Sequence, residues 1–501
     1  MPRTSDQAYA ELVRREKDRS LLNSCAGLLG WDERTHMPPA GANLRGDQLA
    51  LLARMSHEML TDKAMAELLQ EVEAAKPTGD VACNVREIRR VHDRAVKLPK
   101  SLVEELARAT THGQQAWQEA KKKSDFASFR PHLEKIVSLK RQEAQAVGYK
   151  AVPYDALLDE YEPGATTAEV TKTFAELRSE LVPLNQAIAG AKRRPRIEIL
   201  EREYPVDRQR IFGEMAAAAI GFAFDAGALD VTAHPFCSGM GPGDVRITTR
   251  YNPHRFSESF FGVLHEAGHG IYEQNLAPDH YGTPLGHACS LGIHESQSRL
   301  WENLVGRSRP FWDHFFPRAR QVFPLTLHDV AIDDFYFAIN DVRPSLIRIE
   351  ADEATYNLHI ILRFELEQAL IAGDLQPADV PAAWNEKFKS FFALMPPDDA
   401  HGCLQDIHWS AGLFGYFPTY TLGNLYAAQF MEQARSDLPG LDEQFRQGEF
   451  SGLKKWLNEK IHRQGQRYRA PELCKQVTGK TLTHQALMRH LRGKFGGLYG
   501  V

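Results

Sequence analysis

The chain has 501 residues, and its proportions of hydrophobic (43%) and charged (25%) residues are those of an ordinary globular protein. Its 60 lysines and arginines and 65 aspartates and glutamates give a formal net charge of −5. This balance excludes a strongly basic nucleic-acid-binding protein and a highly charged disordered chain. Nucleic acid is therefore not expected as a partner. A membrane is not expected either, because no stretch has the apolar length of a membrane span.

The six cysteines lie far apart in the sequence and form no CxxC pair. In a chain of this size they are expected to be reduced thiols rather than a disulfide framework. The N-terminal residues lack the apolar core of a signal peptide. Together these features predict a cytoplasmic protein.

Helices are predicted for most of the first two hundred residues, because apolar and charged side chains are mixed there as in amphipathic helices. The windows are residues 8–29, 49–75, 102–122, 129–147 and 167–191. A basic cluster at residues 192–196 follows. It has no interleaved aromatic residues, which indicates an exposed loop rather than a nucleic-acid contact.

The pattern changes after residue 195. Residues 196–204, 231–236 and 244–251 are short extended runs, and a Gly/Pro-rich stretch separates the last two. They predict a small antiparallel sheet inserted in a helical protein.

Helical patterns resume at Ser257 and are interrupted by a Gly/Pro/His-rich loop at residues 277–292. No internal repeat or linker marks a domain boundary. We therefore predict a mainly α protein with one large body over residues 1–501. Its parts are a largely helical region, residues 1–195, and a region with the sheet and further helices, residues 196–501.

The sequence His265-Glu266-Ala-Gly-His269 is an HExxH motif. It follows an apolar helical run for which Ser257 is the expected N-cap. On a helix, two histidines four residues apart share a face and reach one ion. Glu266 lies one residue further round, where it approaches a water molecule without being a ligand. The alternative, two buried core histidines, is disfavoured by the complete motif in its helical context.

Two glycines, Gly268 and Gly270, fall inside this helical segment. Glycine costs roughly 1 kcal/mol relative to alanine in a helix interior. Their presence indicates that another part of the chain packs closely against this turn.

A catalytic zinc site needs a third protein ligand and keeps one position open for water. The extended motif HExxHxxGxxH fails, because Tyr272 and Asn275 replace its glycine and third histidine. Glu295 lies 26 residues after His269, at the start of another helical segment, and the spacing favours it only modestly. The other candidates are Glu273, Glu302, His280, His287 and His294.

Further motifs are spread along nearly the whole chain. With the HExxH segment they comprise residues 31–38, 154–164, 234–236, 244–248, 265–269, 294–297, 347–352 and 402–409. In sequence and order they resemble the motifs of the carboxypeptidase Taq family of thermostable metallocarboxypeptidases. One such motif would be weak, whereas this many in order is a specific signal. Cys237, directly after residues 234–236, is a local variation.

The resemblance implies a mostly helical, saddle-shaped fold with a deep groove, a homodimer, and a carboxypeptidase of broad specificity that acts on peptides. It assigns His265, His269 and Glu295 as metal ligands, in agreement with the spacing, and Glu266 as the catalytic glutamate. Zinc, one ion per subunit, is the expected metal for two histidines and one glutamate. Cobalt or manganese also suit such a site.

Glu266 is expected to act as a general base that takes a proton from the attacking water and passes it to the leaving amine. The tetrahedral oxyanion needs donors beyond the metal, and His408 and Tyr420 are the candidates. Tyr420 lies in a segment that resembles the tyrosine-bearing segment of related helical zinc peptidases. A purely structural role is the alternative for both side chains.

A carboxypeptidase must also bind the free C-terminal carboxylate of its substrate, which suits the planar fork of an arginine. Arg348 is the first candidate, with Asp352 expected to orient it. Arg246 is the second, with the alternative that it pairs with Asp244 in the same strand.

Two further residues are candidates for substrate binding. An exposed edge of the predicted sheet would hold a peptide by strand addition, and His234 would contact the peptide there. A structural role at the strand end is the alternative for His234. Gln405, from the last matching segment, is the other candidate.

Two alternative functions remain open. An oligopeptidase or dipeptidyl carboxypeptidase on the same scaffold would use the same chemistry with a different distance from the metal to the carboxylate anchor. A non-catalytic helical peptide-binding protein would not need Glu266 beside the metal ligands, and the presence of this glutamate argues against it.

Overall fold

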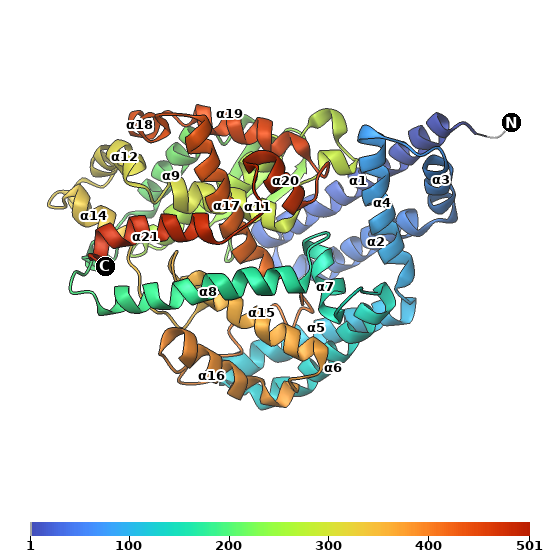
Figure 1. Ribbon diagram of the computed structural model, residues 1–501, viewed down its shortest axis with the longest axis horizontal. Coiled ribbons are helices and arrows are strands. Elements are labelled where there is room, and N and C mark those ends of the chain that lie inside the picture. Colours follow the sequence, from blue (N-terminus) through green and yellow to red (C-terminus); the bar gives the residue numbers. More distant parts are fainter. Residues whose placement is uncertain (1–2) are drawn as a thin grey trace. The chain divides into compact units, whose positions relative to one another are not determined.

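The computed structural model describes residues 3–501 as a mostly helical chain with one small sheet (Figure 1). The prediction of a mainly α protein is confirmed. Among these residues, no helix is both long enough and apolar enough to cross a membrane.

The chain divides into two compact units, each built from three separate stretches. The first unit contains the described residues up to Val96, together with Arg196–Ile339 and Phe430–Thr481. The second unit contains Lys97–Pro195, Asn340–Gln429 and Leu482–Val501. The expectation of one catalytic body over residues 1–501, with parts 1–195 and 196–501, stays a prediction.

The first unit holds the sheet and the HExxH helix. Its α-helices are α1 (Ser5–Thr35), α2 (Ala42–Thr61), α3 (Lys63–Ala74), α4 (Gly79–Lys97), α9 (Val206–Ile220), α10 (Phe256–Gln274), α11 (Leu291–Arg299), α12 (Arg309–Val322), α13 (Pro324–Leu327), α14 (Ile332–Ile339), α18 (Leu441–Gln447), α19 (Ser451–Lys460) and α20 (Ala470–Thr478). Its short turns are η1 (Pro39–Gly41), η2 (Ile197–Ile199), η3 (Phe224–Ala226), η4 (Pro278–His280), η5 (Pro284–Gly286) and η9 (His462–Gln464), and η6 (Leu300–Val305) is a π-helix that continues α11.

The second unit is helical. Its α-helices are α5 (Lys100–Lys123), α6 (Phe126–Val147), α7 (Pro153–Tyr161), α8 (Thr167–Gly190), α15 (Tyr356–Ala372), α16 (Val380–Phe392) and α21 (Gln485–Tyr499). The turns η7 (Arg348–Glu350) and η8 (Pro377–Asp379) join them. The boundary between the units falls within α17 (Pro418–Asp437).

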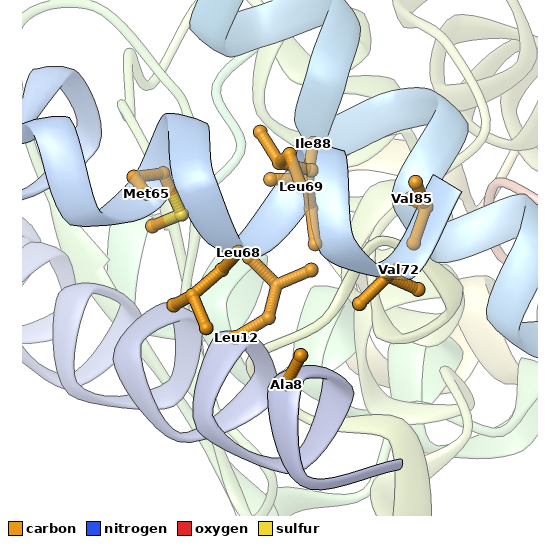
Figure 2. Packing of buried hydrophobic residues seen from close by; sticks show 8 residues of the cluster. All are labelled: Ala8, Leu12, Met65, Leu68, Leu69, Val72, Val85 and Ile88. Carbon is orange, nitrogen blue, oxygen red and sulfur yellow. The ribbon is translucent and has the colours of Figure 1, made fainter. Parts of the chain in front are cut away.

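A hydrophobic cluster in the first unit joins α1, α3 and α4 (Figure 2). Its buried members are Ala8, Leu12, Met65, Leu68, Leu69, Val72, Val85 and Ile88. On α1 and α3 these side chains recur every three or four residues, so each helix turns one apolar face inward. Further along α1, the Ser24 hydroxyl donates a hydrogen bond to the Met240 carbonyl of the sheet. The cluster therefore fixes a helix that contacts the sheet.

The helical windows predicted from the sequence correspond to α1, α2 with α3, α5, α6 and α8, with ends that agree within one residue at Ala74 and Gly190. The sequence reading missed α4 and α7. α4 buries Val85 and Ile88 beside the polar Asn84, Glu87 and His92, so an amphipathic pattern was present in its sequence. α7 has nine residues and begins at a proline, which offers only a short pattern.

The sheet consists of β1 (Gly227–Val231), β2 (Cys237–Gly241) and β3 (Asp244–Thr249), in the spatial order β1-β3-β2. β2 and β3 form the expected antiparallel pair across a tight Gly/Pro turn. β1 pairs with β3 in parallel, with Leu229 opposite Ile247. The predicted small sheet is confirmed, but it is mixed rather than wholly antiparallel, because β1 lies on the far side of β3 from β2.

Two of the three predicted strands were misplaced. Residues 196–204 form the turn η2 and a loop, in which the Tyr204 hydroxyl donates to the Ile199 carbonyl at 2.9 Å. Both side chains are buried by this compact turn, which gives an alternating apolar pattern without a strand. The strand expected at residues 231–236 ends at Val231 instead.

Candidate metal centre

Helix α10 carries the HExxH motif and begins at Phe256. Its N-cap is Arg255, which makes no side-chain capping hydrogen bond, so the expected cap at Ser257 was wrong by two residues. The apolar side chains of α10 are buried on the side that packs against α9 and the sheet. This packing fixes the helix whose polar face bears the two histidines.

The two glycines of α10 allow close approach by neighbouring elements, as the sequence predicted. A Cβ atom on Gly268 would lie 2.7 Å from the Gln297 carbonyl oxygen and 2.7 Å from the Ser298 Cα of α11. A Cβ atom on Gly270 would lie 2.6 Å from the ring of Phe222. Such contacts are too short for any side chain, so Gly268 lets α11 lie directly against α10 and Gly270 makes room for the Phe222 ring.

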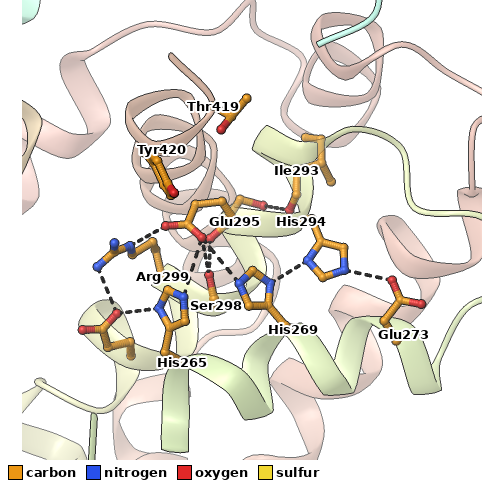
Figure 3. A network of polar contacts seen from close by, with 12 residues as sticks. His265, His269, Glu273, Ile293, His294, Glu295, Ser298, Arg299, Thr419 and Tyr420 are labelled. Carbon is orange, nitrogen blue, oxygen red and sulfur yellow. Dashed lines mark hydrogen bonds and ion pairs between the residues drawn. The ribbon is translucent and has the colours of Figure 1, made fainter. Parts of the chain in front are cut away.

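His265, His269 and Glu295 bring their ligand atoms within 4.8 Å of one another (Figure 3). The Nε2 atoms of His265 and His269 lie 3.7 and 3.5 Å from the same Glu295 oxygen, Oε2. Two imidazole nitrogens and one carboxylate oxygen are a donor set that suits a catalytic zinc site with one open position. The spacing argument for Glu295 therefore agrees with the geometry.

Arg299 binds the other carboxylate oxygen of Glu295, because its Nε donates to Oε1 at 2.7 Å. Arg299 Nη1 also donates to Glu302 Oε2 at 3.1 Å. The same Glu302 oxygen lies 2.9 Å from His265 Nδ1. The Ser298 hydroxyl donates between the Glu295 backbone carbonyl at 2.7 Å and Glu295 Oε2 at 3.1 Å. These contacts orient both a carboxylate ligand and a histidine ligand.

A different chain of contacts lies behind His269. Its Nδ1 is 2.6 Å from Nδ1 of His294, and His294 Nε2 is 2.8 Å from Glu273 Oε1 (Figure 3). Contact with His294 lowers the pKa of Glu273 against the effect of burial, and the tautomer of His294 with its proton on Nε2 donates to Glu273 and accepts at Nδ1 from His269. His269 then keeps its Nε2 lone pair for a metal. Glu273 also lines a cavity of about 400 Å³.

The other candidates for the third ligand have different positions. Glu273, His294 and Glu302 contact the cluster or its neighbours rather than completing it, as described above. His280 pairs with Asp80 at 3.7 Å, and His287 is not part of the three-residue cluster.

The pKa values of the groups in and around this cluster favour the forms that bind a cation. Burial opposes ionisation of Glu302, but Arg299 and the other basic neighbours lower its pKa to about 2. The pKa of Glu295 is likewise lowered, chiefly by Arg299 against the effect of burial. Burial lowers the pKa of His269 to about 3, so its imidazole is neutral. Arg299 and Arg307 thus keep the carboxylates of Glu295 and Glu302 ionised, and an ionised Glu295 oxygen suits a metal ion.

Glu266 is buried beside the cluster and is not one of the three ligands. Burial raises its pKa to about 7, with the neighbouring His265 acting in the opposite direction. A carboxyl group that titrates near neutral pH is suited to accept and return a proton.

Arg246 and His234 also belong to the first unit. Arg246 makes two hydrogen bonds with Asp244, from Nε at 2.8 Å and from Nη2 at 2.9 Å, and its guanidinium lies over the Trp31 ring. This is the pairing that the sequence offered as the alternative for Arg246. His234 is exposed in the loop after β1.

Arg348 lies in the second unit and is buried. Its Nε donates to Asp406 Oδ1 at 2.9 Å and its Nη1 to the Tyr356 hydroxyl at 3.1 Å. Asp406 also accepts from Arg363 at 2.6 Å, so one carboxylate serves two buried arginines. The expected partner Asp352 was wrong, because it accepts backbone N–H groups of the turn before α15 instead.

Asp406 had no role in the sequence reading. It lies in the segment 402–409, which the sequence singled out only by resemblance. The sequence did contain a clue to the role of Asp406, because a carboxylate buried in an aromatic-rich segment requires basic partners.

Gln405, His408 and Tyr420 lie in the second unit as well. The Gln405 side chain accepts from the Arg348 backbone at 2.9 Å and donates to backbone carbonyls, including that of Leu346 at 3.2 Å. His408 Nε2 lies 3.2 Å from the Tyr420 hydroxyl. Burial lowers the pKa of His408 to about 3, so the ring that faces the Tyr420 hydroxyl is neutral. The structure thus brings these two candidates together.

Residues 11–495 match the family described as carboxypeptidase Taq (M32) metallopeptidase. The chain is 46% identical to thermostable carboxypeptidase 1 of Thermus thermophilus, over 99% of this chain and 100% of that protein. It is 36% identical to carboxypeptidase 1 of Bacillus subtilis, over 99% of each. The crystal structure of an M32 carboxypeptidase from Deinococcus radiodurans superposes with a TM-score of 0.95 at 40% identity, covering 99% of this chain and all of that one.

Proposed function

The chain belongs to the carboxypeptidase Taq (M32) family of metallopeptidases, and from this premise we propose that it removes single C-terminal amino acids from peptides, using the cluster of His265, His269 and Glu295. The protein is a metal-dependent carboxypeptidase. The observation that carries the proposal for the site is the convergence of three ligand atoms within 4.8 Å beside a buried glutamate.

Zinc is the proposed metal, one ion per subunit, with cobalt or manganese as alternatives. The donor set supports a fit: His269 is neutral and directs Nε2 at the cluster, and Glu295 is ionised, with Arg299 holding its second oxygen. When bound, such an ion supplies Lewis acidity to the scissile carbonyl group and to a water molecule.

Glu266 is the proposed general base. It takes one proton as the water oxygen bonds to the carbonyl carbon, and it returns this proton to the amide nitrogen as the C–N bond breaks. Both its burial and its pKa of about 7 support this role, because the carboxylate is present at neutral pH and its conjugate acid is strong enough to protonate the leaving amine.

Tyr420 and His408 are the proposed donors for the oxyanion. The neutral His408 accepts the Tyr420 proton in the resting state, and this contact at 3.2 Å orients the phenol. Tyr420 would turn its proton to the developing negative charge, while His408 holds the ring position.

Arg348 is the proposed anchor for the C-terminal carboxylate of the peptide. Asp406 shares its charge between Arg348 and Arg363, so the buried group retains one positive charge. In this proposal Gln405 positions the Arg348 backbone. Arg246 and His234 remain proposed peptide contacts at the sheet.

The test uses a ladder of unmodified peptides, with mass spectrometry of the products. Full-length protein is treated with a chelator, freed of it, and assayed before and after addition of zinc, cobalt or manganese. We expect loss of hydrolysis on chelation, recovery with zinc, and products shortened by one residue at a time. Products shortened by two residues would indicate the dipeptidyl alternative, and hydrolysis that persists without metal would contradict the proposed site.

A homodimer and a cytoplasmic location complete the proposal. The six free cysteines support a reducing compartment. Fractionation of the source cells with an antibody against the chain tests the location, and a periplasmic or secreted pool would contradict it.

A further inference from the structure

A cavity of about 400 Å³ lies at the C-terminal end of α10. It is bounded by α1, by the turn between β2 and β3, and by the segment that follows α10, all of them in the first unit. The polar side chains that line it include Asn23 of α1, Glu273 of α10, and Tyr281 and His287 of the segment after α10. The proposed reaction gives none of these side chains a step, so the cavity has no assigned role.

Glu273 connects this cavity to the metal cluster. His265, His269 and Glu273 follow one another at intervals of four residues, so they share one face of α10 (Figure 3). His294 lies between Glu273 and His269, with contacts of 2.8 and 2.6 Å. These two contacts and two imidazole rings separate Glu273 from the metal side of His269, a span of up to roughly three extended residues at about 3.3 Å each. The cavity is therefore within reach of a peptide bound at the cluster.

Strand β2 leads from the proposed general base to the cavity. Burial and the nearby carboxylates of Glu266 and Glu273 raise the pKa of Cys237, so the first residue of β2 lies near both. Two residues further on, a Cβ atom on Gly239 would lie 2.7 Å from Glu273 Oε2. β2 is an outer strand of the sheet. Because a carboxypeptidase releases a single residue, a site two or three residues from the reacting bond receives the part of the peptide before that bond.

The charge of the cavity is negative. The Glu273 side chain is 24% exposed, and while its Oε1 contacts His294, no hydrogen bond or ion pair within residues 3–501 reaches its Oε2. Burial lowers the pKa of the lining residue His287, so that its ring is neutral. Arg19, whose charge acts on His287, is paired with Glu16 at 2.6 Å. Within the described part of the chain, the second Glu273 oxygen therefore has no cationic partner.

We propose that this cavity, which we call the Glu273 cavity, binds a cationic group of the peptide before the scissile bond. The inference rests on the proposed carboxypeptidase function and names a substrate class, peptides with an ammonium or guanidinium group at this position. The group belongs to a lysine or arginine side chain or to the amino terminus of a short peptide. Glu273 Oε2 accepts a charge-assisted hydrogen bond from it. The side chains of Asn23 and Tyr281, which make no hydrogen bond within residues 3–501, supply further polar contacts.

The test is equilibrium binding without turnover, by isothermal titration calorimetry of metal-loaded Glu266→Gln protein. N-acetylated peptides carry lysine, or norleucine of similar length, at the first, second or third residue before the scissile bond. Lysine at the second or third residue should bind about 10-fold more tightly than norleucine, as for a hydrogen bond to a charged group. Short peptides without lysine, compared with and without the acetyl group, show whether an amino terminus gives the same gain. The kcat/KM values of the unmodified protein should follow the same order.

Two variants change the charge of the cavity. Glu273→Gln should abolish the preference for lysine over norleucine, and the two peptides are compared within the variant because Glu273 also contacts His294. Asn23→Lys brings an ammonium group of the protein to the same carboxylate, so it should abolish the preference too, with metal content unchanged. Asn23→Gln is the matched control and should keep the preference of the unmodified protein.

Two results would overturn the inference. One is equal affinity for the lysine and norleucine peptides at every position, together with no gain from a free amino terminus. The other is a preference for the cationic peptides that both Glu273→Gln and Asn23→Lys retain. Both are binding results, so they count against the Glu273 cavity whether or not the protein hydrolyses peptides, whereas an absence of hydrolysis counts against the proposed function alone.

Discussion

The proposed ligand Glu295 has one carboxylate oxygen available for a metal ion, because Arg299 holds the other. Arg299 also binds Glu302, and Glu302 in turn contacts the outer nitrogen of His265. One arginine thus fixes two of the three ligands. Sequence spacing favoured Glu295 as a ligand but treated Glu302 as its rival, because spacing does not separate a ligand from the residue that orients a ligand.

We predict that Arg299→Ala lowers metal affinity by about 10- to 100-fold, the usual effect of losing a group that orients a ligand. Equilibrium competition with a chelator, read out by metal analysis, measures it without reference to activity. Arg299→Lys should recover part of the affinity. Arg309→Ala is the control, because Arg309 pairs with Asp313 and Asp333 and touches no ligand. Unchanged affinity in Arg299→Ala would contradict the orienting role.

The role of Glu266 is tested by Glu266→Gln, which keeps the shape of the side chain and removes the base. We expect kcat to fall by about 10²- to 10⁴-fold, the usual contribution of a general base, with metal content unchanged. Glu258→Gln, in the first turn of the same helix, should retain normal turnover. Near-normal hydrolysis by Glu266→Gln would show that the base lies elsewhere.

The carboxylate anchor makes a prediction about substrates. Arg348→Ala should reduce kcat/KM for peptides with a free C-terminus far more than for the same peptides with a C-terminal amide, since only the former bring a carboxylate. Arg348→Lys keeps the charge and should lose less. Equal losses on both kinds of peptide would indicate a structural role for the Arg348–Asp406 pair.

At the scale of elements, the contact between α10 and α11 sets the relative positions of the three proposed metal ligands. α10 supplies both histidines and α11 supplies Glu295, so the distance between the helices determines whether three ligands meet. Gly268 lies at this contact, and α11 backbone atoms occupy the space where its Cβ would be. The sequence signalled the close approach, because a glycine inside a helix needs a packing reason.

We predict that Gly268→Ala destabilises the protein by about 1–3 kcal/mol, because the methyl group must displace backbone atoms of α11. It should also weaken metal binding as α11 moves. Gly262→Ala on the same helix is the matched control: its Cβ would make an ordinary 3.6 Å contact, and alanine favours the helix by up to about 1 kcal/mol. Chemical denaturation of both variants measures the difference, and equal stability would contradict the packing argument.

The same scale shows where sequence patterns failed. The helices α1, α5, α6 and α8 followed from their apolar spacing, whereas α4 was missed, and the HExxH helix began within two residues of its expected cap. The parallel pairing of β1 with β3 did not follow, because strand direction depends on the path of the chain between distant segments. The alternating residues 196–204 were read as a strand, although a turn buries Ile199 and Tyr204 equally well.

At the scale of the whole molecule, each unit is assembled from stretches that are remote in sequence. Asp406 pairs with Arg363, which lies 43 residues earlier in the chain, and with Arg348, which lies 58 residues earlier. No local pattern carries such contacts, so Asp406 had no predicted role. The proposed metal site could be predicted from the sequence, because its two histidines lie on one helix and the proposed third ligand lies on the next helix of the chain.

The C-terminal stretch returns to the second unit through α21 and a buried ion pair. Lys494 and His490 of α21 each contact Glu353 at 2.6 Å. Burial opposes ionisation of Glu353, yet Lys494 and His490 lower its pKa to about 2. A carboxyl group with a depressed pKa in the folded state stabilises the fold above its unfolded pKa of about 4.5, and this stabilisation is lost as the pH falls towards 2.

We therefore predict that Glu353→Gln lowers the free energy of unfolding of the second unit by about 3 kcal/mol at pH 7, which corresponds to a shift from about 4.5 to about 2. The deficit should shrink between pH 4.5 and pH 2, because acid protonates Glu353 in the unmodified protein as well. Hydrogen exchange of the α21 amides over this pH range measures it. Glu459→Gln, at an exposed pair with Lys455, should cost at most about 0.5 kcal/mol with no such trend. A deficit that stays constant down to pH 2 would show that Glu353 acts through packing rather than through its charge.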